Sequence, residues 1–101
     1  MMEQYQVTLH SQMGPRNGTL TLNCQDRRIT GTLVLVGYCN PIQGEMSDDG
    51  KLHIRHRIQT VMSTFLCETV LERHSDTLTG ITTAAPCQIR WDGVRISGGN
   101  P

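Results

Sequence analysis

Apolar and polar residues alternate along most of the chain, and glycine, proline, asparagine or aspartate interrupts the alternation at intervals. Side chains of a β-strand point to its two faces in turn, so each alternating segment predicts a strand with one face buried. The pattern is clearest in a Gly-Thr-Leu-x-Leu phrase, which occurs at 18–22 and again at 31–35. No run of ten or more residues has the apolar spacing of three and four that a helix needs, so no helix longer than a turn is expected.

The alternation predicts an all-β fold with eight or nine short strands. They are expected at 5–10, 19–24, 29–38, 42–46, 51–59, 61–71, 78–83 and 89–96, with bends at 39–41, at 47–50 and at 91–93. A chain of 101 residues has room for one domain, 1–101, whose last residues, 97–101, are expected to be a loose tail. We predict an antiparallel up-and-down meander, closed or nearly closed into a small barrel of about eight strands, because closure removes exposed strand edges.

The two halves of the sequence also resemble each other. Shifting it by 49 positions brings six identical residues into line, among them Leu22 with Leu71, Gly31 with Gly80 and Gly44 with Gly93. This shift predicts that the barrel consists of two similar halves of about four strands, related by a pseudo-two-fold axis.

The composition of the chain limits which nucleic acids, membranes, metals or cofactors the protein is expected to bind. Nine basic and nine acidic residues leave a net charge of zero, which removes the long-range attraction on which nucleic-acid binders depend. The N-terminus has no secretory signal and no apolar run could cross a bilayer, so a cytoplasmic protein without membrane contact is expected. The four cysteines have no zinc-site spacing and are interpreted as free thiols in a reducing compartment. No metal and no cofactor is predicted.

Two residues are the candidates for ligand binding. His56 lies among Leu52, Ile54 and Ile58 on the face of its strand that is expected to point inward, and Trp91 could close a barrel mouth. Each has a plainer alternative, as a hydrogen-bonded core histidine and as a core anchor. His53 and His56 cannot bind one metal ion, because residues three apart in a strand point to opposite faces.

Two outer surfaces are also candidates. His53, Arg55 and Arg57 share a face that could hold an anion, although a solvated barrel surface is the simpler interpretation. Val34, Val36 and Tyr38 make the second face of their strand apolar as well, so a subunit interface of a homo-oligomer is predicted there.

No nucleophile, phosphate-binding or metalloprotease motif occurs, and no catalytic residue is predicted. The leading hypothesis is a non-enzymatic barrel that binds a small, largely apolar molecule inside or at its mouth. The alternatives are a homo-oligomeric or protein-interaction module that uses the apolar outer strand face, and a small barrel isomerase or cyclase.

The succession of Met13-Gly14, the two Gly-Thr-Leu phrases, Asn40-Pro41-Ile42 and Gly44-Glu45 resembles a group of small uncharacterised bacterial proteins of about one hundred residues. The resemblance covers most of the first half and thins to Gln59-Thr60 in the second. It implies a compact β-barrel with a lipocalin-like or streptavidin-like meander, and it implies no activity. The cysteines and histidines are more numerous here than in that group.

Overall fold

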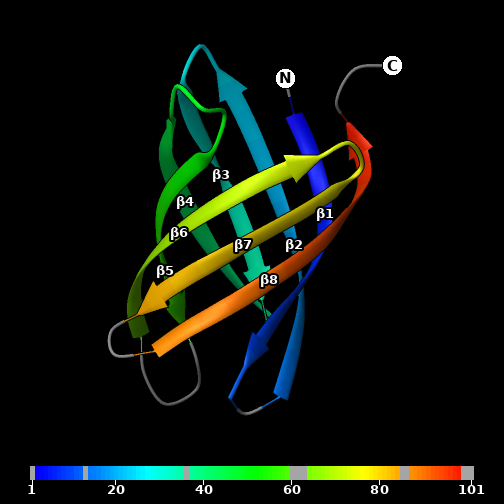
Figure 1. The fold of residues 1–101 in the computed structure, drawn as a ribbon. Coiled ribbons are helices and arrows are strands. Elements are labelled where there is room, and N and C mark those ends of the chain that lie inside the picture. The colour runs from blue at the N-terminus through cyan, green and yellow to red at the C-terminus, as the bar shows by residue number, and fades with distance from the viewer. Residues whose placement is uncertain (1, 13, 36, 60–63, 85–86, 99–101) are drawn as a thin grey trace.

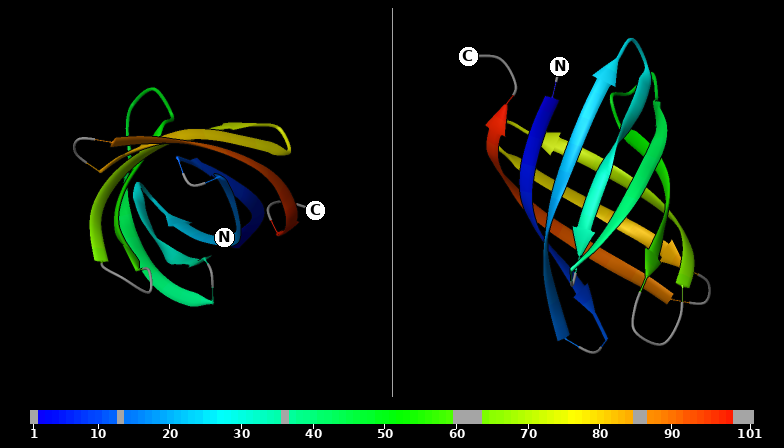
Figure 2. Two further views of the ribbon diagram at one scale, coloured as in Figure 1. Left: turned by 90° about the horizontal axis from the view of Figure 1, so that it is seen from below. Right: turned by 180° about the vertical axis from the view of Figure 1, so that it is seen from behind.

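The computed structural model describes residues 2–12, 14–35, 37–59, 64–84 and 87–98. Eight strands follow one another in an antiparallel up-and-down meander, and the last pairs with the first to close a barrel (Figures 1 and 2). They are β1 (Met2–Ser11), β2 (Gly14–Gln25), β3 (Arg28–Leu35), β4 (Tyr38–Met46), β5 (Leu52–Gln59), β6 (Thr64–His74), β7 (Thr77–Ala84) and β8 (Cys87–Gly98). The predicted fold class is therefore confirmed. Among the described residues no helix is long and apolar enough to cross a membrane.

Alternate side chains of every strand point into the barrel and form one apolar core. Its fully buried members are mostly leucine, isoleucine and valine, joined by Tyr5 and Trp91. The face assignments made from the sequence hold for β5, where Leu52, Ile54, His56 and Ile58 are buried while His53, Arg55 and Arg57 are exposed. Phe65 alternates with the buried Cys67 on β6, but Phe65 is 50% exposed because it lies at the beginning of that strand.

Two of the expected bends lie inside continuous strands. Pro41 belongs to β4, where its missing N–H costs nothing because the β4–β5 ladder begins only at Ile42. Gly93 belongs to β8 and pairs with Val7 on one side and Leu78 on the other. A β-carbon at Gly93 would lie 2.9 Å from the Val7 side chain, so glycine serves close packing at this position and not a turn.

The two halves predicted from the sequence are visible in the strand registers. The 49-residue shift carries the β1–β2, β2–β3 and β3–β4 registers onto those of β5–β6, β6–β7 and β7–β8, as in the pairs Glu3–Leu22 and Leu52–Leu71, Leu22–Gly31 and Leu71–Gly80, and Ile29–Gly44 and Leu78–Gly93. It also relates Asp26 to Ser75, the two described non-glycine residues with positive φ, at 58° and 57°. Among the described strands the registers differ at the two joins between the halves. Ile42 of β4 pairs with His56 of β5, whereas Trp91, the equivalent of Ile42, pairs with Leu9 and not with Val7, the equivalent of His56.

The pseudo-symmetric pair Gly44 and Gly93 allows a matched test of packing. A β-carbon at Gly44 would collide with backbone atoms of His53 and Ile54, whereas at Gly93 the nearest atom belongs to the Val7 side chain, which can rotate away. We expect Gly44→Ala to lower the free energy of unfolding by about 3 kcal/mol and Gly93→Ala by about 1 kcal/mol. Chemical denaturation of both variants measures the difference, and equal losses would contradict the backbone clash.

Candidate functional site

Four buried residues, one from each strand of the second half, form a polar cluster inside the barrel. They are His56 on β5, Thr69 on β6, Thr82 on β7 and Trp91 on β8, and together they are called the polar set below. Nε2 of His56 lies 2.6 Å from Oγ1 of Thr69, which lies 2.5 Å from Oγ1 of Thr82. The rings of His56 and Trp91 meet edge to face with their centroids 5.9 Å apart. The two residues chosen from the sequence are therefore in contact.

Two nitrogen atoms of the polar set have no hydrogen-bond partner among the described residues. They are Nδ1 of His56 and Nε1 of Trp91, and both are buried. Leaving a buried polar atom unpaired costs about 1 to 3 kcal/mol, so each such atom in a folded protein requires an explanation. By contrast, the buried amide of Asn40 donates to the backbone carbonyls of Leu33 and Tyr38.

The equivalent positions of the first half are apolar. The 49-residue shift relates the polar set to Val7, Leu20, Leu33 and Ile42, called the apolar set below, all of which are buried. The same backbone framework thus accepts four apolar side chains in these places. The polar set is therefore not something that the fold itself demands.

The charge state of the polar set follows from its burial. Burial lowers the pKa of His56, and a contact with the backbone of Arg57 that does not meet hydrogen-bond geometry offsets this shift only in part. The imidazole is consequently neutral at pH 7, with one ring nitrogen as donor and the other as acceptor. Burial also raises the pKa of the neighbouring Cys67 thiol, which keeps that group uncharged and unreactive.

Acid should therefore destabilise the protein through His56. Its pKa in the folded state lies below the ordinary value of 6.5, so the unfolded chain takes up a proton first as the pH falls. The stability that neutral His56 contributes is present above pH 6.5 and is lost below it. We expect wild-type protein to lose more unfolding free energy between pH 7.5 and pH 5 than the His56→Leu variant, as measured by urea denaturation. His53→Leu, on the outer face of the same strand, is the matched control and should behave as wild type.

A second buried polar cluster joins strands far apart in the sequence. Glu3 on β1 accepts a hydrogen bond of 2.5 Å from the Tyr5 hydroxyl. It also forms an ion pair of 2.6 Å with Arg73 on β6. Burial, and then the hydrogen bond to Glu3, raise the pKa of Tyr5, so its hydroxyl remains a donor. All partners are satisfied here, which marks the cluster as a structural link between the two halves.

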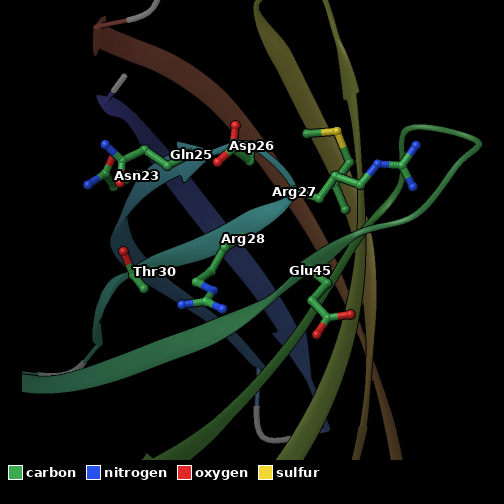
Figure 3. Close-up of a pocket in the computed structure, with 8 residues that line it drawn as sticks. Asn23, Gln25, Asp26, Arg27, Arg28, Thr30 and Glu45 are labelled. Carbon is green, nitrogen blue, oxygen red and sulfur yellow. The ribbon is translucent and has the colours of Figure 1, made fainter.

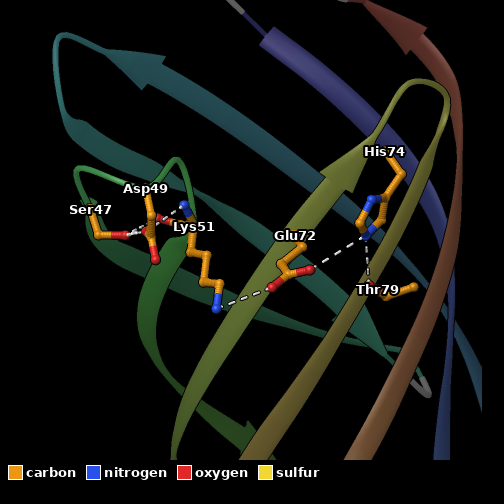
Figure 4. Close-up of polar contacts among 6 residues, drawn as sticks. All are labelled: Ser47, Asp49, Lys51, Glu72, His74 and Thr79. Atoms are coloured by element: carbon orange, nitrogen blue, oxygen red, sulfur yellow. Dashed lines mark hydrogen bonds and ion pairs between the residues drawn. The ribbon is translucent and has the colours of Figure 1, made fainter.

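Polar contacts on the outer surface are exposed and mutually satisfied. Glu72 pairs with Lys51 at 3.3 Å and with His74 at 3.6 Å, while His74 also lies 3.2 Å from the Thr79 hydroxyl (Figure 4). A hollow over β2, β3 and β4 is lined by Arg27 and Arg28 but also by Asp26 and Glu45, so its charges offset one another (Figure 3). Neither place holds an unpartnered buried group that would indicate a ligand.

The predicted interface residues lie in different environments. Val34 is 40% exposed on β3, Tyr38 is half-buried at the beginning of β4, and Val36 lies outside the described residues. The second half exposes more apolar side chains on its outer surface, where the first half has polar ones at equivalent positions; they are Leu66, Val70, Ile81, Val94 and Ile96. An interface around Val34 stays a prediction.

Self-association through Val34 has a direct test. A lysine at this position would place an unpaired charge in an apolar interface, so Val34→Lys should convert an oligomer into monomers. Light scattering measures the mass of both proteins, and Ile81→Lys on the second half is the matched control. A wild-type protein that is already monomeric would remove the homo-oligomer hypothesis.

Sequence reasoning found two members of the polar set and missed the other two. Thr69 and Thr82 looked like ordinary strand threonines, although their alternation with Cys67 and Leu78 placed them on inward faces. Their alignment with Leu20 and Leu33 under the 49-residue shift was the signal that could have identified them. The Glu3–Arg73 pair had no comparable signal, because its partners are 70 positions apart.

The basic face of β5 and the cysteines, which the sequence also offered as candidates, have ordinary surroundings. His53, Arg55 and Arg57 are exposed on the outer face of β5. Cys24, Cys39 and Cys67 are free thiols, and the described residues include no group of three or more potential ligands that could hold a metal ion.

Fold and site together define a small eight-stranded meander barrel with a polar cluster inside its second half. No protein-family model matches the chain, and neither a curated protein nor a solved structure matches it.

Proposed function

We propose that this protein is a non-enzymatic barrel that binds a small, largely apolar molecule in its interior, in the manner of a lipocalin. The polar set supplies the binding groups, with Trp91 and His56 in direct contact with the ligand. The observation that carries the proposal is the pair of buried nitrogens without partners, which belong to core positions that are apolar in the first half of the barrel.

The contrast between the halves supports a functional origin of the polar set. Polar groups in a core destabilise a protein unless every partner is present, and the apolar set shows that this framework can do without them. Sites that break the local rules of folding are commonly the sites where function resides. The surroundings are apolar, since Ile42 and Cys67 flank His56 while Leu9 and Gly80 flank Trp91.

The proposal is tested by looking for a bound molecule. Native mass spectrometry of protein purified from the cells that produce it should show an added small mass, and the His56→Leu/Thr69→Val/Thr82→Val triple variant should lack it. The variant fills the same space without the polar groups, so it separates ligand binding from barrel formation. Two ligand-free proteins, together with a Trp91 fluorescence that no small apolar probe alters, would overturn the proposal.

A further inference from the structure

The hydrogen-bond chain of the polar set has two possible directions. In one, Thr82 donates to Thr69, and Thr69 donates to Nε2 of His56. In the other, Nε2 of His56 donates to Thr69, and Thr69 donates to Thr82. Each threonine hydroxyl carries one proton, and a neutral imidazole carries one as well, so the direction decides which ring nitrogen of His56 is protonated.

Proton counting favours the first direction. In the second, the Thr82 proton would need a further acceptor, and within the described part of the chain the Thr82 hydroxyl contacts no acceptor except Thr69. Thr82 is fully buried, so that proton would be left without water or partner. In the first direction each threonine hydroxyl proton has an acceptor, and the ring proton of the neutral His56 lies on Nδ1.

Both unpartnered atoms of the site are then N–H donors. The indole Nε1 of Trp91 is always a donor, and Nδ1 of His56 becomes one through the Thr82–Thr69 chain. These donors belong to two buried rings whose centroids are 5.9 Å apart. What satisfies them must be a hydrogen-bond acceptor.

The surroundings decide the charge of that acceptor. Arg55 and Arg57, the cations nearest to His56 along β5, lie on the outer face, and Arg73 is already paired with Glu3. A buried carboxylate would therefore lack a counter-charge, which is far more costly than burying a neutral oxygen. We infer that the ligand presents an uncharged carbonyl-type oxygen, as in a ketone, ester, lactone or amide, to the two N–H donors. This inference rests on the proposed function.

The first measurement concerns His56 and requires no ligand. Long-range ¹H–¹⁵N spectra, assigned with the His56→Leu variant, should show the tautomer protonated on Nδ1 at pH 7. Thr69→Val removes the hydroxyl that donates to Nε2, so this preference should be lost in that variant. A His56 protonated on Nε2 in the wild-type protein would overturn the inferred donor pair, whatever the protein binds.

The second measurement uses two probes of nearly equal shape, cyclohexanone and methylenecyclohexane. The chain has one tryptophan, so its indole N–H gives a single resonance. Cyclohexanone should move this proton downfield and bind about tenfold more tightly than methylenecyclohexane, because only the ketone accepts hydrogen bonds. Equal binding of both probes would overturn the carbonyl class while the proposed function stands. If neither probe moves the resonance at any concentration, the proposed function fails, and the inference fails with it.

Discussion

The Thr69→Val variant is expected to lose about 1 to 3 kcal/mol of unfolding free energy, whereas the His56→Leu/Thr69→Val/Thr82→Val triple variant should be at least as stable as wild type. The Thr69 hydroxyl bonds both to His56 and to Thr82, so its removal alone leaves two buried polar groups without partners. Removing all three polar groups leaves none of them unpaired. Guanidinium denaturation followed by circular dichroism measures both effects.

The expected changes in unfolding free energy are strongly non-additive, because the single substitution costs more than the triple substitution that contains it. This makes the test specific. Trp91 is unchanged in every variant, so its unpaired Nε1 contributes equally to all of them. Thr8→Val is the control for loss of a hydroxyl: its bond to Asn17 is exposed, and we expect a change within about 0.5 kcal/mol. A triple variant that is less stable than Thr69→Val would show that the polar set stabilises the barrel, and would contradict a functional origin of these residues.

The strand pattern predicted most of the fold because inward and outward positions alternate with a strict period of two. Inward Leu20, Leu33 and Ile54 could be assigned from this period alone, since burial of one face fixes the register. Pro41 and Gly93 misled the prediction because both residues usually end strands. Here the missing N–H of Pro41 faces no partner strand, and Gly93 makes room for a core side chain.

The site was less predictable than the fold, because its members are brought together only by barrel closure. His56 and Trp91 come from β5 and β8, which are not neighbours in the sheet, and only the closed barrel brings their rings into contact. Threonine is common on both the inward and the outward face of a strand. Thr69 and Thr82 therefore became informative only when their hydrogen-bond partners were known.

The internal repeat explains how a barrel of this size can hold a polar cluster. The apolar set and its neighbours supply a well-packed half, while the second half gives up four apolar core positions to polar side chains and Trp91. Under the proposed function, the first half would supply stability and the second half would supply the binding groups. The ion pair of Glu3 with Arg73 adds a side-chain link between the halves to the β4–β5 and β1–β8 ladders.

Arg73→Ala should be the most damaging substitution of a charged residue in the barrel, with a loss of about 3 kcal/mol of unfolding free energy. The side chain of Glu3 is only 7% exposed, and without Arg73 its charge would be buried with no counter-ion. Urea denaturation at pH 7 measures the loss. The Glu3→Gln/Arg73→Leu double variant, which removes both charges, should recover much of it because no unpaired charge remains.

The matched control is Arg95→Ala. The Arg95 side chain is 30% exposed, like that of Arg73, and its ion pair with Asp76 is also 2.6 Å long, but Asp76 is 73% exposed. Water solvates an exposed carboxylate when its partner is removed, so we expect a loss of less than about 1 kcal/mol. The contrast isolates burial of the acid as the cause, since the arginine, its exposure and the pair distance are the same. Equal losses in the two variants would mean that packing of the arginine side chains, and not the buried charge of Glu3, joins the halves at this end of the barrel.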